Sequence, residues 1–135
     1  PTLIGKVDID TKVLEKVRQL AVNVVNAKGG TGWRAKIDGV TVAGKTGTAQ
    51  VVRLGSEAVK DHAWFVAFAP AENPMIAMAI VVENVGHGGE FAAPIAKSVM
   101  EVYFRKVGML AAPEEHEEQS PAGTEEDTES TGMEE

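Results

Sequence analysis

The short segment Lys45-Thr46-Gly47-Thr48 combines residue types that can hold a peptide ending in a carboxylate. A lysine ammonium favours anionic groups beside it, and a threonine hydroxyl can donate a hydrogen bond to a carboxylate. A glycine removes the side chain that would keep a substrate peptide away from a strand. On an edge strand, the free N–H and C=O groups could pair with that peptide as an added strand. The segment is therefore a candidate substrate-binding strand, although an ordinary strand entering a turn has the same composition.

The same residues fit a second pattern, because Gly39 to Thr46 matches the phosphate loop of nucleotide-binding proteins: Gly, four residues, then Gly-Lys-Thr. Such a loop must be a compact turn followed by a helix whose N-terminus faces the phosphate. Here Val40-Thr41-Val42 favours extended backbone, and residues 47–52 have strand character without a helical period. A phosphate- or nucleotide-binding module that uses Gly39–Thr46 is thus an alternative that its own flanking residues disfavour.

A helix is expected before the candidate strand, over residues 11–27. Its apolar residues recur at three- and four-residue steps, with polar residues on the other side; they are Val13, Leu14, Val17, Leu20, Ala21, Val24 and Val25. Asp10 or Thr11 can cap the first turn, and Gly29-Gly30 provides the stop. The run Gly29-Gly30-Thr31-Gly32 then reads as a flexible turn before Trp33.

Three strands are expected next. Residues 40–52 are rich in β-branched side chains, and the apolar runs 62–69 and 75–82 are bounded by turn residues. Runs of this kind suit strands covered on both faces. The five residues Pro70–Pro74 that join the two runs favour an antiparallel hairpin. Trp64, Phe65 and Phe68 are the aromatic core candidates.

A second helix is expected from Phe91 to Val107, after the glycine-rich segment Gly86-His87-Gly88-Gly89. Pro94 would occupy its first turn, where a missing N–H is harmless, and Gly108 would end it. Its apolar face would consist of Ile95, Val99, Val102 and Tyr103. The order predicts an α+β fold, in which a small antiparallel sheet of about three strands is flanked by an N-terminal and a C-terminal helix.

Several motifs in this order resemble class B penicillin-binding proteins, most closely the rod-elongation type known as penicillin-binding protein 2. K-T-G is one element of such serine enzymes. The resemblance covers roughly residues 1–107 and rests on Val42–Gln50, Asp61–Pro70, Val82-Glu-Asn, His87-Gly-Gly and Ala93-Pro94. It implies the C-terminal part of a transpeptidase domain with the penicillin-binding/β-lactamase-like fold.

The resemblance also implies an activity, in which a serine attacks the D-Ala-D-Ala bond of a peptidoglycan stem peptide and passes the acyl group to a neighbouring amine. β-Lactams would acylate the same serine. Lys45 would join the hydrogen-bonding network at a second-motif serine. Thr46 and Thr48 would contact the substrate carboxylate, and the Thr48 backbone N–H would complete the oxyanion hole. The parent protein would be membrane-anchored, at the periplasmic face of the bacterial inner membrane.

The nucleophile of that reaction is missing from this sequence. Ser-x-x-Lys places a lysine amine one helical turn from the serine hydroxyl. Ser56 is followed three residues later by Val59, Ser98 is followed by Glu101, and the other two serines lie after residue 112. Ser-x-Asn fails at all four serines as well. We therefore expect neither transpeptidase activity nor β-lactam acylation from this chain alone, and Pro1 in place of Met hints at an excerpt.

Charge divides the chain into two parts. Residues 1–112 carry all 13 basic and 10 acidic side chains, a net charge of +3, whereas residues 113–135 carry the other 10 acidic ones. The first part reads as one domain, and the second as an acidic disordered tail with too few apolar residues to fold. An acidic tail that binds a basic partner would make the chain a non-catalytic partner-binding domain, which is a further alternative. Neither part suggests a nucleic-acid interface.

No metal or cofactor site is expected. The chain has no cysteine, and His62, His87 and His116 show no ligand-type spacing to acidic residues. His87 with Gly88-Gly89 reads as the turn into the last helix, and Glu83 and Glu90 as solvated or capping groups. The expected partners are the remainder of the parent domain and, through an open edge of the 75–82 strand, a second copy of the chain.

Overall fold

The computed structural model describes residues 5, 8–50 and 60–112. The elements are α1 (Thr11–Asn26), a short 3-10 helix η1 (Trp33–Ala35), β1 (Ala43–Ala49), β2 (His62–Ala69), β3 (Ile76–Val82) and α2 (Gly88–Lys106). This order confirms the predicted α+β fold with three strands and two flanking helices. The one element that the sequence did not predict is η1. The acidic segment 113–135 and the connection at 51–59 lie outside the described residues.

The three strands form one antiparallel sheet in the order β1-β2-β3, as the short Pro70–Pro74 connection predicted. In the register between β1 and β2, Lys45 lies opposite Val66, Thr46 opposite Phe65, and Gly47 opposite Trp64. Within the described part of the chain, β1 and β3 are therefore the two edges of the sheet. The strand predicted over residues 40–52 is shorter in the structure, since β1 begins at Ala43 and ends at Ala49. Val40 forms only an isolated bridge with Ile37, and residues 51 and 52 are not among the described residues.

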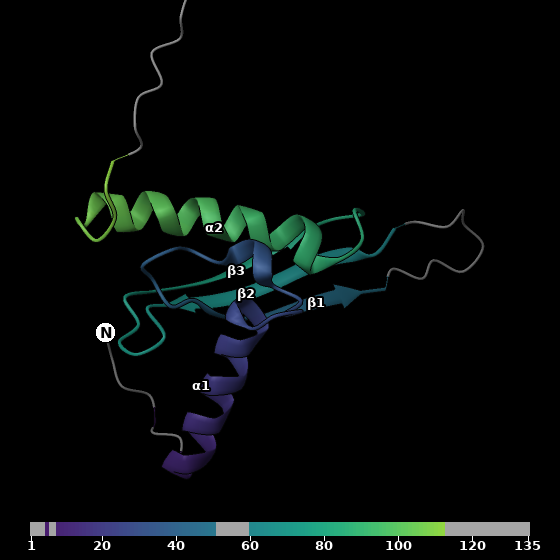
Figure 1. The fold of residues 1–135 in the computed structure, drawn as a ribbon. Helices are drawn as coiled ribbons and strands as arrows, with labels where there is room; N and C mark the ends of the chain where they lie inside the picture. Colours follow the sequence, from purple (N-terminus) through teal and green to yellow (C-terminus); the bar gives the residue numbers. More distant parts are fainter. Residues whose placement is uncertain (1–4, 6–7, 51–59, 113–135) are drawn as a thin grey trace, which may run out of the picture.

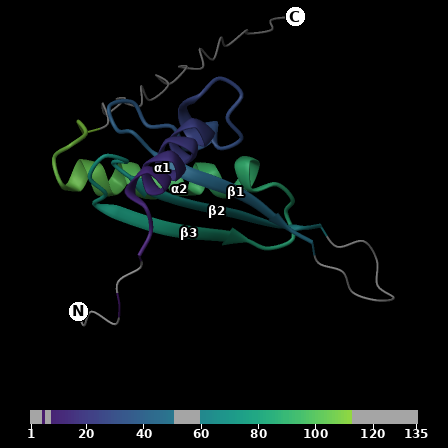
Figure 2. The same ribbon diagram turned by 90° about the horizontal axis from the view of Figure 1, so that it is seen from below.

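The two helices lie on opposite sides of this sheet (Figure 1). α2 runs along one face, with η1 on the same side, whereas α1 approaches from the other side and extends away from the sheet (Figures 1 and 2). The Asp10 side chain caps α1 by accepting a hydrogen bond from the Lys12 N–H at 2.7 Å. Because only the C-terminal end of α1 reaches the sheet, Val25 is its only buried residue.

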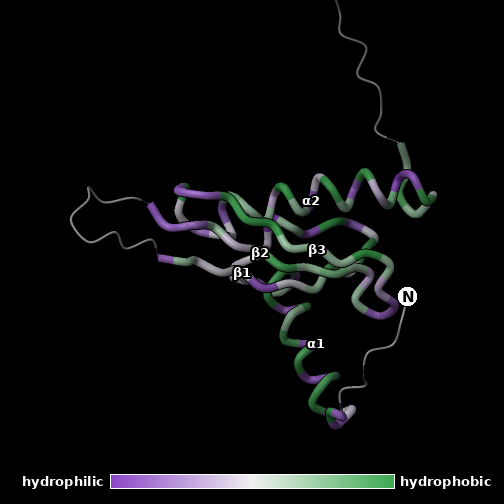
Figure 3. Tube along the Cα trace, turned by 180° about the vertical axis from the view of Figure 1, so that it is seen from behind, coloured by the Kyte–Doolittle hydropathy of each residue, from purple (hydrophilic) through white to green (hydrophobic). Residues whose placement is uncertain are grey.

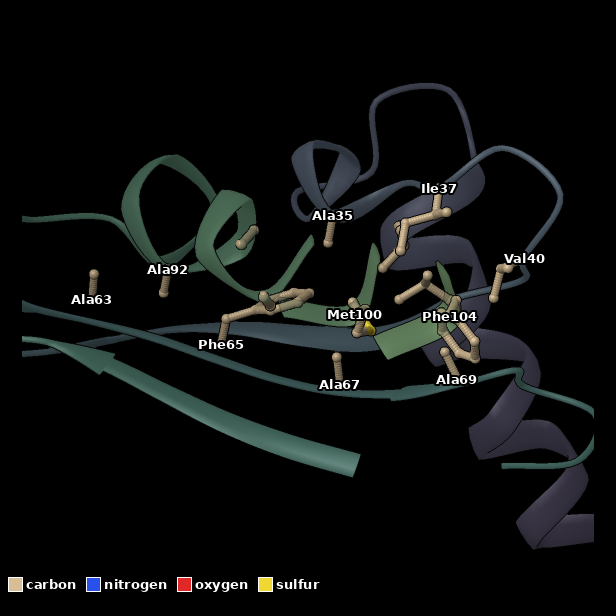
Figure 4. Packing of buried hydrophobic residues seen from close by; sticks show 14 residues of the cluster. Ala35, Ile37, Val40, Ala63, Phe65, Ala67, Ala69, Ala92, Met100 and Phe104 are labelled. Atoms are coloured by element: carbon tan, nitrogen blue, oxygen red, sulfur yellow. The ribbon is translucent and has the colours of Figure 1, made fainter. Parts of the chain in front are cut away.

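The core lies between the sheet and α2 (Figure 4). Phe65 and Ala67 of β2 point towards the helix, where Met100 and Phe104 are fully buried. The segment around η1 closes one side of this layer and contributes Ala35, Ile37 and Val40. Each of these buried apolar side chains stabilises the fold by roughly 1.5–3 kcal/mol, apart from the smaller alanines.

The prediction for the apolar face of α2 was wrong for three of its four residues. Ile95, Val99 and Val102 are exposed, whereas Tyr103 is half-buried and packs against the core. The fully buried side chains are those of Ala92, Ala93, Ala96, Met100 and Phe104. Three alanines let the helix axis approach the sheet closely, so the buried stripe follows small side chains rather than the β-branched ones. A pattern that weighs residues by hydrophobicity favours the larger side chains and therefore selects the opposite face.

Coverage of the strands on both faces was also wrong. β2 alternates between buried and exposed positions, and Trp64 and Val66 are 40% and 47% exposed on the side away from α2. Of the three aromatic core candidates, Phe65 is buried, Phe68 is half-buried and Trp64 is not in the core. The reason is that α1 leans away from the sheet and covers only one end of this face. Figure 3 shows that hydrophobic and hydrophilic residues alternate along α1.

The start of α2 lies three residues earlier than predicted, at Gly88, with His87 as its N-cap residue. Pro94 therefore lies in the second turn, where a residue with an N–H would bond to the Glu90 carbonyl. Its own carbonyl accepts a hydrogen bond from Ser98 Oγ at 3.1 Å. The predicted end is confirmed, because Gly108 follows the helix with a positive φ of 76°. Neither helix among the described residues is long and apolar enough to cross a membrane.

Candidate functional site

The candidate substrate-binding residues Lys45-Thr46-Gly47-Thr48 all lie on β1, an edge strand within the described part of the chain. The Lys45 side chain is exposed, and its Nζ donates a hydrogen bond to the Thr46 carbonyl oxygen at 2.7 Å. Side chains alternate between the two faces of a strand. Thr46 and Thr48 therefore lie on the face that α2 covers, and Lys45 and Gly47 lie on the other.

Thr46 and Thr48 line a cleft of about 590 Å³ beside this strand. Its other walls come from the segment between α1 and η1 and from the first turn of α2. The complete lining is Gly29, Gly30, Thr31, Trp33, Arg34, Thr46, Thr48, His87, Gly88, Gly89 and Glu90. Lys45 and Gly47 are not part of the lining. The fold thus brings the two predicted hydroxyl groups together in one cleft, and it leaves the ammonium group outside.

The cleft exists in this form because α2 begins in direct contact with the strands. A Cβ on Gly88 would overlap the Trp64 carbonyl oxygen and would lie 2.5 Å from that of Gly47. A Cβ on Gly89 would overlap the carbonyl oxygen of Thr31. The glycines at the start of α2 therefore allow close approach of two backbones, which the interpretation of this segment as a turn did not reveal.

The wall opposite α2 is the turn at Thr31. The Gly32 N–H donates to the Val24 carbonyl at the end of α1 at 2.9 Å, and a Cβ on Gly30 would overlap that same carbonyl oxygen. This turn, predicted to be flexible, is held by backbone hydrogen bonds. The hydroxyl of Thr31 lies 3.0 Å from the hydroxyl of Thr46. A candidate site residue is thus connected to a residue fifteen positions earlier that the sequence did not single out.

Asn26 joins α1 to the chain that leads into β1. Its Nδ2 donates to the carbonyl oxygens of Val22 and Val42, each at 2.8 Å. Val42 is completely buried. This side chain therefore fixes the end of α1, and with it the Thr31 turn, relative to the beginning of β1.

Ionisable side chains also line the cleft. Arg34 lies over the Trp33 ring, with its Cζ 4.8 Å from the ring centroid, and both side chains are exposed. Glu90 and His87 stand on the opposite wall. Neither Arg34 nor Trp33 was predicted to belong to the site, since only proximity in the fold relates them to β1.

The phosphate-loop alternative is wrong. Gly44, Lys45 and Thr46 are part of β1, and the strand continues to Ala49 where a phosphate loop would need a helix. The backbone at Thr46 is therefore extended and cannot form the compact turn that surrounds a phosphate.

The histidines and serines among the described residues have structural contacts. His62 Nδ1 accepts a hydrogen bond from the Asn84 N–H at 3.0 Å, and His87 precedes α2. Ser98 donates to the Pro94 carbonyl. Glu83 and Glu90 are exposed. Within residues 5, 8–50 and 60–112, no group of three or more His, Asp or Glu side chains is arranged to hold a metal ion. His116 and Ser56 lie outside the described residues.

This edge strand, with two threonines on a cleft that the first turn of a helix closes, belongs to a fold that known proteins share. The sequence profile of the penicillin binding protein transpeptidase domain matches residues 1–101. The chain belongs to this family, and its three-stranded sheet with two helices is part of the penicillin-binding/β-lactamase-like fold.

Its relatives are peptidoglycan D,D-transpeptidases. Peptidoglycan D,D-transpeptidase MrdA of Haemophilus influenzae is 41% identical over 103 residues, which cover 68% of this chain and 16% of that protein. The structure of Pseudomonas aeruginosa PBP2 in complex with WCK 5153 is 38% identical, with a TM-score of 0.63 over 73% of this chain and 20% of that one. An imipenem acyl-enzyme complex of penicillin-binding protein A from Mycobacterium tuberculosis is 36% identical, with a TM-score of 0.56 over 71% and 20% of the two chains.

These comparisons confirm the resemblance to penicillin-binding protein 2 and to its transpeptidase domain. The chain spans less than one fifth of the length of the MrdA protein that it matches.

Proposed function

We propose that this chain supplies the substrate-binding strand of a peptidoglycan D,D-transpeptidase whose nucleophilic serine lies in another part of the protein. β1 would bind the end of the stem peptide as an added strand, with Lys45, Thr46, Gly47 and Thr48 as the binding residues. The chain alone would be inactive.

The observation that carries this proposal is the position of Thr46 and Thr48, whose side chains line the same cleft beside an edge strand. Two hydroxyls on one wall can both donate to a carboxylate, which accepts several hydrogen bonds. Gly47 supports the binding of an added strand, because it has no side chain that would keep a peptide away from β1. A side chain at this position would also crowd the neighbouring strand β2, where the Trp64 Cβ would lie 3.1 Å from a Cβ on Gly47.

In the proposed reaction, a serine oxygen attacks the carbonyl of the penultimate D-Ala, the peptide bond breaks, and the terminal D-Ala leaves with a proton on its amine. An amine of a second stem peptide then attacks the acyl-enzyme and releases the serine. Thr46 and Thr48 would hold the terminal carboxylate of the first peptide. The Thr48 N–H would stabilise the negative charge that develops on the attacked carbonyl oxygen.

Lys45 would act next to the nucleophile. Its ammonium reaches only the Thr46 carbonyl of its own strand within the described residues, and its side chain is exposed. It is therefore available to hydrogen-bond with a serine that the remainder of the domain supplies. The parent protein would bind β-lactams through the same serine and would work at the periplasmic face of the inner membrane, held there by an anchor.

Covalent labelling by a fluorescent penicillin tests the proposal. The full-length protein that contains this chain should be labelled at one serine outside residues 1–135, and the isolated chain should not be labelled. Thr46→Val in the full-length protein should lower the labelling rate, whereas Thr41→Val, a threonine outside the cleft lining, should leave it unchanged. Labelling of the isolated chain would refute the proposal, as would equal rates for Thr46→Val and the unaltered protein.

A further inference from the structure

We propose that Thr31 is a positioning residue for the proposed reaction. It donates a hydrogen bond to the Thr46 hydroxyl, and it thereby directs the Thr46 proton towards the substrate carboxylate. This inference rests on the proposed function, since it assigns Thr31 a role only through Thr46.

The two hydroxyl oxygens are 3.0 Å apart, and both side chains line the same cleft. They come from separate parts of the fold: Thr46 from the middle of β1, and Thr31 from the turn between α1 and η1. A hydroxyl pair at this distance is within hydrogen-bonding range, and either oxygen can be the donor in the free protein.

The presence of a carboxylate decides the direction of this bond. A threonine hydroxyl has one proton and two lone pairs, while an ionised carboxylate can only accept. If Thr46 gives its proton to the carboxylate, it can interact with Thr31 only as the acceptor. Thr31 then donates, and this donation strengthens the bond from Thr46 to the carboxylate, because hydrogen bonds in a chain polarise one another.

The rotamer of Thr46 depends on the same contact. Threonine has three staggered positions about χ1, and only some of them point the hydroxyl into the cleft. On one side of the side chain stands the Thr31 hydroxyl; on another is α2, where a Cβ on Gly89 would lie 3.4 Å from the Thr46 methyl carbon. The bond to Thr31 therefore favours the rotamer with its methyl group towards α2 and its hydroxyl towards the turn.

Thr31 is itself firmly held, as a positioning residue must be. The neighbouring Gly32 N–H is bonded to the Val24 carbonyl, and Gly89 of α2 stands so close to the Thr31 carbonyl oxygen that a Cβ would overlap it. The turn is thus enclosed between the end of α1 and the start of α2, and its hydroxyl has a defined place relative to β1.

The test compares two acyl donors in the full-length protein: a D-Ala-D-Ala peptide with a free terminal carboxylate, and the same peptide as its methyl ester. Thr31→Val replaces the hydroxyl by a methyl group at nearly equal volume. We expect it to lower kcat/KM for the carboxylate donor about fivefold, the loss typical of one neutral hydrogen bond, and to leave the ester within about twofold. Thr31→Ser keeps the hydroxyl and should restore the ratio between the two donors.

General damage to the protein would lower kcat/KM for both donors by the same factor. A Thr31→Val variant in which the ratio of kcat/KM for the carboxylate donor to that for the ester is unchanged therefore overturns the inference. So does a Thr31→Ser variant that behaves like Thr31→Val. If Thr31→Val fails to fold, Thr31→Ala removes the same hydroxyl without adding a group, and the same ratio decides. The double variant Thr31→Val/Thr46→Val should have the ratio of Thr46→Val alone.

Thr46→Val separates this inference from the proposed function. The deciding quantity is the ratio of kcat/KM for the carboxylate donor to kcat/KM for the ester donor. If this ratio is lower in Thr46→Val and unchanged in Thr31→Val, the role of Thr31 alone is overturned. An unchanged ratio in Thr46→Val overturns the proposed role of Thr46 in carboxylate binding, and the role of Thr31 with it.

Discussion

Replacing Gly88 by alanine adds one methyl group where α2 begins against β1 and β2. Two effects of opposite sign follow. Alanine favours a helix over glycine by about 1 kcal/mol in an exposed interior position, and by less in a first turn. The new Cβ would overlap the Trp64 carbonyl oxygen and would lie 2.5 Å from that of Gly47. Both obstacles are backbone atoms of paired strands, so neither can rotate away as a flexible side chain would.

We therefore expect the steric effect to exceed the gain in helix propensity. Overpacking of a tight site costs about 1–3 kcal/mol, so Gly88→Ala should lower the free energy of unfolding by a net 1–2 kcal/mol or so. Relief of the overlap must move the first turn of α2 away from β1, which should also shift the amide resonances of Gly47 and Trp64.

Urea unfolding followed by circular dichroism measures the change in stability, and an amide correlation spectrum measures the displacement. Gly5→Ala is the control, because among the described residues no atom would lie within 4 Å of a Cβ on Gly5. A Gly88→Ala chain as stable as the unaltered one, with unchanged Gly47 resonances, would show that α2 does not begin in contact with the strands.

Three further predictions concern the core, the junction of α1 and the exposed apolar surface. Phe104→Ala should lower the free energy of unfolding in urea by about 3–5 kcal/mol, because Phe104 is fully buried. Val102→Ala, at a position 64% exposed on the same helix, should change this free energy by less than about 1 kcal/mol. Equal effects of the two substitutions would contradict the assignment of the buried face of α2. Asn26→Ala should lower the free energy of unfolding by about 1–3 kcal/mol in the same assay, since it leaves the buried Val42 carbonyl without its Asn26 donor. Asn23→Ala is the control, because it removes only an exposed hydrogen bond to Gln19. An equal loss of stability in both variants would contradict the role of Asn26 in joining α1 to β1. The isolated chain should self-associate through the exposed apolar residues of α1 and the edge of β3, as measured by sedimentation velocity. Val17→Lys, at a position 57% exposed, should weaken this association, and Ser98→Lys should leave it unchanged. A chain that sediments as a monomer at all concentrations would contradict the prediction.

Local patterns in the sequence were sufficient for the order and type of the main elements. The structure confirms the hairpin connection at Pro70–Pro74 and the Asp10 cap, and it confirms a strand within residues 40–52, limited to Ala43–Ala49. Each of these predictions rested on a few neighbouring residues. They succeeded because strand propensity, loop length and capping are local properties of the backbone.

The predictions of burial failed where the burial of a side chain depends on elements that are distant in the sequence. On α2 the choice between Val99 and Ala96 as the buried residue depends on how closely the helix approaches the sheet, and Trp64 is exposed because α1 leans away from β2. Both depend on the separation and angle of packed elements, which hydrophobic periodicity does not contain.

For the site, the sequence by itself determined the residue types on β1 and the absence of a Ser-x-x-Lys nucleophile from this chain. Only the tertiary structure decided which of these residues share a cleft, because strand alternation separates Thr46 from Lys45, and the first turn of α2 closes over the Thr46 side. The Thr31 turn also belongs to the site only because of contacts between elements that are distant in the sequence. Close approach of backbones at Gly30, Gly88 and Gly89 brings the end of α1, β1 and the start of α2 together, and no spacing along the chain records these contacts.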